Sequence, residues 1–292
     1  MATSRNASHA GSWYSGCEKE LNSHLDGWLS RVDVKAPSTR ALIAPHAGYA
    51  YCGACAAYAY NQVDPTNIKR VFILGPSHHK SLPGCAVTQT HTYETPLYDL
   101  KVDLEVTEEL LATGKFDKMS ISVDEDEHSI EMHLPYIAKV MQSKRNNFTV
   151  VPVLVGSTTH EKEAMYGKIF SKYLQNPENL FVISSDFCHW GKRFRYTYYD
   201  KSKGAIHKSI EDLDKTGMNI IEQLDTAGFY KYLDRYSNTI CGRHPIGIFL
   251  NAVNDMKSSV ASFKFHNYAQ SSQCKKSDDS SVSYAAGTLT LS

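Results

Sequence analysis

Four short apolar runs rich in branched residues recur along the chain, at residues 41–44, 71–74, 149–156 and 180–185. Each run is almost continuously apolar and is bounded by Pro, Gly or Ser. Strands that are buried on both faces of a mostly parallel sheet have this pattern. The runs therefore predict four strands of one central sheet.

Apolar residues at helical spacing separate these runs, within residues 21–32, 130–141, 165–174 and 206–213. Strands that alternate with amphipathic helices indicate an α/β fold, with a mostly parallel or mixed central sheet flanked by helices.

The C-terminal part of the chain has a different pattern. Residues 263–270 and 282–291 resemble two strands joined by a polar, exposed loop, which predicts an antiparallel pair at a sheet edge. No repeat, low-complexity tract or Pro/Gly/Ser-rich linker divides residues 1–292, so we expect one continuous domain.

Composition excludes several classes of function. The 31 Lys and Arg residues balance the 31 Asp and Glu residues, which gives no electrostatic case for binding nucleic acid or an acidic membrane surface. No apolar run approaches the roughly 18 residues that a membrane span needs. The N-terminal stretch lacks the apolar core of a signal peptide, and the odd count of seven cysteines favours reduced thiols. We therefore expect a cytoplasmic protein.

Imidazoles and a carboxylate follow three of the predicted strands. "ALIAPHAGY" leads to His46, "VFILGPSHH" leads to His78 and His79, and "FVISSDFCHW" leads to Asp186 and His189. Ligands of parallel α/β sheets bind at the carboxyl ends of the strands, so these side chains are expected to share one metal or catalytic site. Neighbours in an extended chain face opposite ways, so only one of the adjacent histidine pair is expected to be a ligand.

The identity of a third ligand decides the metal. Two histidines and a carboxylate form the ligand set of non-haem Fe(II) sites, and Asp186 would supply the carboxylate. A thiolate would favour copper, with Cys188 and Cys241 as candidates. Cys241 precedes an apolar helical run, and a helix start favours the thiolate, although a buried inert thiol explains this residue equally well.

Two other groups have weaker metal or redox signals. Cys52 and Cys55 have redox spacing but lie in an Ala- and Tyr-rich stretch that predicts a helix, so we interpret them as small core residues. His128 and His133 are five apart and would face different sides of a helix. His128 and Glu131 share a helix face, and they either border the site or cap the helix.

Seven motifs together carry a resemblance to a known family: "SHAGSWY", "APHAGYAYCG", "LGPSHH", "DEHSIEMHLPY", "SSDFCHWG", "ICGRHPIG" and "NYAQSSQC". The chain resembles the Memo family, mediators of cell motility downstream of a receptor tyrosine kinase, from His9 to about Leu291. The resemblance implies a fold similar to that of the class III extradiol dioxygenases, which cleave aromatic rings with non-haem iron.

The resemblance also implies roles for individual residues. By position, His46, His78 and Cys241 would be the metal ligands. Asp186 and His189 would line the same pocket, with His189 in the place of the dioxygenases' acid–base histidine. The spacing in "SSDFCHW" further leads us to expect that Asp186 accepts a proton from the His189 ring. The remaining residues that the resemblance places around the cleft are Trp13, Tyr51 and Arg195. The dioxygenases have glutamate where this chain has Cys241, and the softer thiolate makes copper plausible.

Three functions follow from these expectations. The first is a copper- or iron-handling redox protein that acts in signalling, motility and the regulation of the cytoskeleton and of oxidants. The second is an active non-haem iron dioxygenase of an unknown substrate. The third is an adaptor that binds a phosphotyrosine peptide in a relic cleft, with Arg193 and Arg195 facing the phosphate. The resemblance implies signalling partners, through a receptor tyrosine kinase phosphopeptide or a small GTPase pathway, and the nucleus as a second location.

Overall fold

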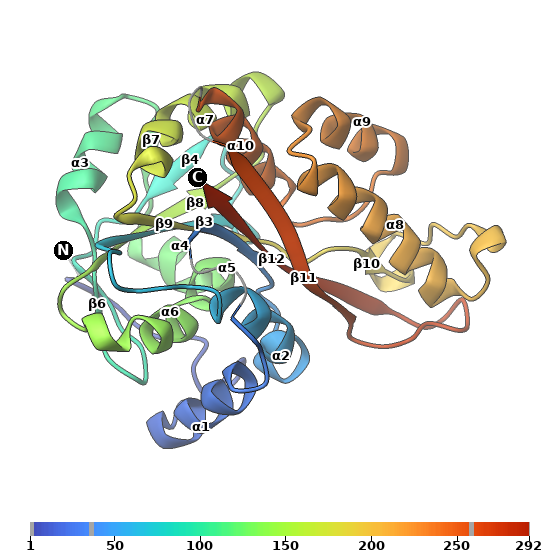
Figure 1. The fold of residues 1–292 in the computed structure, drawn as a ribbon, viewed down its shortest axis with the longest axis horizontal. Coiled ribbons are helices and arrows are strands. Elements are labelled where there is room, and N and C mark those ends of the chain that lie inside the picture. Colours follow the sequence, from blue (N-terminus) through green and yellow to red (C-terminus); the bar gives the residue numbers. More distant parts are fainter. Residues whose placement is uncertain (1–2, 35–37, 257–259, 292) are drawn as a thin grey trace.

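A mixed central sheet with helices on both faces organises the chain (Figure 1). The structure is a computed structural model that describes residues 3–34, 38–256 and 260–291. The central sheet has the strand order β10-β12-β2-β9-β3-β8-β4-β7, and β11 pairs with β12. Its strands are β2 (Thr39–Ala44), β3 (Arg70–Pro76), β4 (Cys85–Val87), β7 (Phe116–Lys118), β8 (Thr149–Val155), β9 (Asn179–Ser184), β10 (His189–Trp190), β11 (Ala261–Gln270) and β12 (Ser281–Leu291).

A second, small sheet and the helices complete the described fold. The small sheet consists of β1 (Ser4–Arg5), β5 (Thr92–Tyr93) and β6 (Leu100–Lys101). The α-helices are α1 (Glu18–Leu29), α2 (Tyr49–Tyr60), α3 (Leu104–Ala112), α4 (Ile121–Asp126), α5 (His128–Glu131), α6 (Leu134–Val140), α7 (His160–Gln175), α8 (Ile206–Glu222), α9 (Thr226–Tyr236) and α10 (Arg243–Asp255). Three short 3₁₀ helices are η1 (Gln142–Lys144), η2 (Lys192–Phe194) and η3 (Lys201–Lys203). Among the described helices, none is long and apolar enough to cross a bilayer.

The four predicted apolar runs form the parallel centre of the sheet. β2 pairs with β9, β9 with β3 and β3 with β8, all in parallel. Successive side chains of each strand enter opposite cores: Phe72 and Leu74 belong to one, and Val71 and Ile73 to the other. Figure 1 shows α7 and α10 on one side of the sheet and α1, α2 and α6 on the other. Burial on both faces explains why these strands are apolar without alternation.

The C-terminal strands form the predicted antiparallel pair. β11 and β12 pair along nearly their whole length, and β12 also pairs antiparallel with β2. The pair thereby extends the parallel centre into a mixed sheet. The predicted parallel centre of the sheet and the predicted antiparallel C-terminal pair are both confirmed.

One predicted helix is divided in two. The apolar stripe of residues 130–141 falls on α5 and α6, which are separated by Met132 and His133. Pro135 stands in the first turn of α6, where its missing N–H costs nothing, but inside a continuous helix it would remove a hydrogen bond. Cys52 and Cys55 lie on α2 as expected, and both are buried in the core.

Asp214 is a buried carboxyl that joins α8 to the loops around the sheet edge. Its Oδ1 accepts hydrogen bonds from the Cys188 backbone N–H at 3.2 Å and the Asn238 side chain at 2.9 Å. Its Oδ2 accepts one from the Tyr268 hydroxyl at 2.9 Å. Burial raises the pKa of Asp214 to about 6, because these hydrogen bonds offset only part of the lost hydration.

The change Asp214→Asn should alter the pH dependence of stability. The folded pKa of Asp214 lies above the value of about 4 for an unfolded chain, so its contribution to stability is complete below pH 4 and is lost as the pH rises through 6. An asparagine keeps one acceptor for Cys188 and Asn238, while the Tyr268 hydroxyl can donate to Ser283 instead. Relative to wild type, the variant should gain about 2–3 kcal/mol in free energy of unfolding between pH 4 and pH 8. Urea denaturation at both pH values measures this gain, and equal differences at the two would contradict it.

Candidate metal centre

Three neighbouring strands of the central sheet deliver their carboxyl ends to one edge. β2 ends at Ala44, β9 at Ser184 and β3 at Pro76, and β9 lies between the other two. The segments that follow carry His46, Asp186 and the pair at residues 78–79. The topology therefore brings together segments that are far apart in the sequence, as parallel pairing requires.

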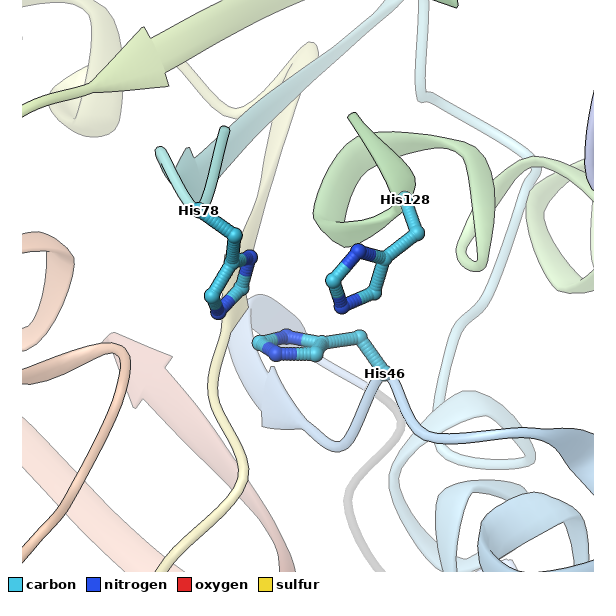
Figure 2. A group of neighbouring side chains, drawn as sticks. All are labelled: His46, His78 and His128. Atoms are coloured by element: carbon cyan, nitrogen blue, oxygen red, sulfur yellow. The ribbon is translucent and has the colours of Figure 1, made fainter. Parts of the chain in front are cut away.

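Figure 2 shows the imidazoles of His46, His78 and His128 turned toward one another. One ring nitrogen from each lies within 4.8 Å of those of the other two, so these three side chains could hold a metal ion. The rings of His78 and His128 are stacked with centroids 4.5 Å apart, and the His46 ring stands edge-on to both. Of the adjacent pair, His78 belongs to this group and His79 does not.

A hydrogen-bond chain fixes the orientation of the His46 ring. The Ser184 hydroxyl donates its proton to the Ser129 carbonyl at 2.7 Å, so it can only accept from His46 Nδ1, which lies 2.6 Å away. His46 Nδ1 therefore carries the ring proton, and Nε2 presents a lone pair to the cluster. Burial, together with the neighbouring His78 and His128, lowers the pKa of His46 well below its ordinary value and keeps the ring neutral.

Glu127 is a buried carboxylate next to the other two histidines. Burial alone would raise its pKa, but hydrogen bonds from the His78 ring and from two backbone N–H groups outweigh this effect and lower the pKa to about 2. Burial and the neighbouring His78 lower the pKa of His128 to about 3. The cluster thus has an ionised carboxylate beside the neutral His128 imidazole.

Cys241 joins the cluster from the loop before α10. Its Sγ lies 3.2 Å from His46 Nε2 and accepts the Asp186 backbone N–H at 3.2 Å. Burial and the nearby Asp186 carboxyl raise the pKa of the Cys241 thiol. Since His46 Nε2 is an acceptor, the thiol donates to it. Cys188, the other candidate thiol, is buried in the core beneath the sheet edge, among the side chains that contact α7 and α10.

Gly242 allows this loop to approach the end of β9. A Cβ at Gly242 would lie 2.4 Å from the Ser184 carbonyl oxygen and 2.4 Å from the Ser185 Cβ. The Gly242 N–H also donates to the Ser185 hydroxyl at 3.1 Å. Only a glycine permits this contact, which sets Cys241 beside His46.

Asp186 and His189 lie at the same edge, but they do not form the expected pair. The Asp186 carboxylate accepts the His46 backbone N–H at 2.8 Å. His189 Nδ1 lies 2.9 Å from the Phe187 carbonyl and 3.1 Å from the Thr239 carbonyl. Because carbonyls only accept, His189 donates through Nδ1, and its tautomer is fixed by the backbone rather than by Asp186. The expected proton acceptance by Asp186 is therefore wrong.

The three residues predicted around the cleft differ in their contact with the cluster. The Trp13 ring packs on His128 with centroids 4.4 Å apart and is 37% exposed. Tyr51 is 66% exposed in the first turn of α2. Arg195 is exposed in a left-handed backbone conformation, and within the described residues its guanidinium has no partner.

His128 was not predicted as a member of the cluster. The sequence left it at the border of the site, because it begins a short helix and does not follow a strand. The only signal was its place in "DEDEHSIEMHLPY", next to Glu127. Glu131 is directed away from the cluster, where its carboxylate accepts hydrogen bonds from Arg5, His9 and Tyr14. Although it was expected to share a helix face with His128, it does not add a ligand atom to the cluster.

The donors present fit a transition-metal ion. Neutral imidazole nitrogens with their second nitrogen occupied, next to a thiol sulfur, are the ligand types of copper, iron and zinc, whereas Mg²⁺ and Ca²⁺ prefer oxygen. The fold and the cluster together define an α/β protein with a candidate metal centre at the carboxyl edge of its sheet.

Comparisons with known proteins agree with this class. The Memo-like protein family matches residues 5–288, and the chain belongs to that family. It is 61% identical over 289 residues to "Protein MEMO1" of Rattus norvegicus, covering 98% of this chain and 97% of the rat protein. It is 60% identical to "Protein MEMO1" of Homo sapiens with the same coverage. "Protein memo-1 homolog" of Caenorhabditis elegans is 52% identical, covering 98% of this chain and 82% of the nematode protein.

A solved structure shares the fold. The "Crystal structure of uncharacterized protein JW3007 from Escherichia coli K12" superimposes with a TM-score of 0.51 and covers 84% of this chain and 98% of the bacterial one. The two sequences are 12% identical, so this likeness concerns the fold alone.

Proposed function

We propose that this chain is a copper- or iron-binding redox protein that acts in cell signalling and motility and in the regulation of the cytoskeleton and of oxidants. The observation that carries the proposal is the placement of Cys241 Sγ 3.2 Å from His46 Nε2, beside the cluster that includes His78. His46, His78 and Cys241 would hold the ion, and His128 lies close enough to contribute. A bound copper or iron ion would supply one-electron oxidation and reduction.

The residues of the chain itself would bind the ion and handle protons around it. His46 presents Nε2 because Ser184 occupies Nδ1, and His189 presents Nε2 because two carbonyls occupy its Nδ1. The pocket residues Asp186 and His189 would therefore act differently, with Asp186 holding the His46 backbone and His189 giving or taking a proton.

A dioxygenase is the second candidate, favoured by the accessible Nε2 of His189. Such an enzyme would use a carboxylate as its third ligand, which in this chain would have to be Asp186. The Asp186 carboxylate is already bonded to the His46 backbone N–H, and a thiol is nearest to His46 Nε2 instead. These contacts favour the redox protein over ring cleavage.

The proposed partners and location follow from the same assignment. Exposed Trp13, Tyr51 and Arg195 would contact signalling proteins, including a receptor tyrosine kinase phosphopeptide or a component of a small GTPase pathway. The seven cysteines are all free thiols, which supports a reducing compartment, and we propose the cytoplasm with the nucleus as a second location.

Metal-free protein reloaded anaerobically with Cu(I) or Fe(II) should retain about one ion per chain, as one cluster of three to four donors allows. Elemental analysis after desalting measures the stoichiometry, and X-ray absorption identifies the donors. Mixed nitrogen and sulfur ligation is the expected result. Failure to retain either ion, combined with metal-independent binding of a phosphotyrosine peptide, would replace this proposal with the adaptor function.

A further inference from the structure

Glu127 contacts two histidines of the cluster at the atoms that face away from its centre. Glu127 Oε1 lies 2.8 Å from His78 Nδ1 and 3.4 Å from His128 Nδ1, and the Glu127 side chain is 2% exposed. Glu127 is also the N-cap of α5, the helix that begins with His128. One buried carboxylate therefore connects a strand-end histidine and a helix-start histidine.

The other hydrogen bonds of Glu127 determine which partner donates. Its Oε2 accepts the His78 backbone N–H at 2.6 Å, and its Oε1 accepts the Ser129 backbone N–H at 3.0 Å. Both oxygens are thus acceptors already, and the short contact with the His78 ring requires Nδ1 to donate. In the neutral form of the ring this places the lone pair on His78 Nε2, as on His46 Nε2.

We propose that Glu127 is a positioning residue of the metal centre: it holds His78 in the tautomer and orientation that present Nε2 to an ion. The inference rests on the proposed function, since it concerns the same centre. Ser184 has the matching role for His46, but its hydroxyl is neutral, whereas the carboxylate also makes the His78 imidazole a stronger electron donor. The two ligands are therefore held differently, His78 by a charged acceptor and His46 by a neutral one.

Glutamine cannot replace this carboxylate without loss. Glu127 accepts two backbone N–H groups, one on each oxygen, in addition to the His78 ring. An amide offers one accepting oxygen, so in either orientation its NH₂ group meets an N–H donor. The variant Glu127→Gln should therefore release the His78 ring, while its size stays nearly unchanged.

Two measurements on the full chain test the positioning role. In metal-free wild type with ¹⁵N-labelled histidine, the His78 signals should show a protonated Nδ1 and a bare Nε2, and in Glu127→Gln they should shift toward the other tautomer. Competition with a Cu(I)-chelating dye should show the affinity of Glu127→Gln lower by about 10–100-fold, as for other partners of metal-binding histidines, at an unchanged stoichiometry. The matched control is Asp126→Asn, which removes one charge at the exposed neighbouring residue and should leave both readouts as in wild type.

The outcomes separate this inference from the proposed function. Wild type that binds no Cu(I) would overturn the proposed function, and the positioning role with it. Wild type that binds Cu(I) no more tightly than Glu127→Gln would overturn the positioning role alone. If the variant does not fold, the wild-type ¹⁵N spectrum decides, because a protonated Nε2 on His78 would contradict the inference directly.

Discussion

Copper binding should weaken by about two orders of magnitude or more in Cys241→Ser, because a neutral hydroxyl replaces the soft thiolate that Cu(I) prefers. The Cys241 sulfur lies beside His46 Nε2 and is held there by the Asp186 backbone N–H. A serine is smaller and keeps a hydrogen-bonding group, so the loop should keep its conformation. Cu(I) competition titration of the metal-free protein measures the loss.

Cys188→Ser is the matched control for this change. Cys188 is two residues beyond Asp186 and is more buried than Cys241, and it packs into the core away from the histidine cluster. Its substitution should leave Cu(I) affinity within about threefold of wild type, because the proposed ligands His46, His78 and Cys241 are all still present. A greater loss in Cys188→Ser than in Cys241→Ser would show that the wrong thiol has been assigned.

The second large effect concerns His189, whose removal should separate metal binding from turnover. His189 is tethered through Nδ1 to the Phe187 and Thr239 carbonyls, which leaves Nε2 free to transfer a proton. His189→Ala should retain nearly all bound metal while losing about a hundredfold or more of any metal-dependent redox turnover that needs proton transfer. Bound metal per chain and the rate of oxygen consumption are the two measurements.

His79→Ala is the control for the loss of an imidazole near the cluster. His79 is exposed and lies outside the group formed by the other three histidines, so both readouts should match wild type. Loss of metal in His189→Ala would make His189 a ligand. Full metal with unchanged turnover would remove its acid–base role and favour peptide binding in the cleft.

The strand pattern made the edge of the sheet predictable. The runs at residues 41–44, 71–74 and 180–185 are apolar without alternation because both faces of β2, β3 and β9 are buried, and this signal is local. Parallel pairing then places the residues that follow these strands together without further information. For this reason, the strand pattern was sufficient to associate His46, Asp186 and one of the adjacent pair His78 and His79, without deciding which.

Two features of the site depended on tertiary contacts: which of the two thiols lies next to His46, and the presence of a third histidine, His128. Cys188 follows β9 and Cys241 precedes α10, so both lie near the edge of the sheet in the sequence. Only the close approach of Gly242 to Ser184 shows that Cys241 is the thiol next to His46. His128 arrives on α5, which packs against the end of β3 through the hydrogen bond from Ser129 to Pro76. Neither contact has a periodicity that a sequence pattern could reveal.

The expected partner of His189 illustrates a different limit. Asp186, three residues earlier, was the nearest acidic group in the sequence, and a carboxylate is the usual partner of a functional imidazole. The backbone supplied the acceptors instead, through Phe187 and Thr239. Carbonyl directions depend on loop conformation, which residue types and spacing do not determine.

The contact of Gly242 with the end of β9 has a consequence for how an ion would enter. Cys241 is fixed by its backbone neighbours and His46 by Ser184, so both donors stand in place before any metal arrives. Loading such a centre requires little ordering of the chain, unlike the small zinc domains whose folding depends on their metal. An ion would therefore enter and leave a protein that stays folded throughout.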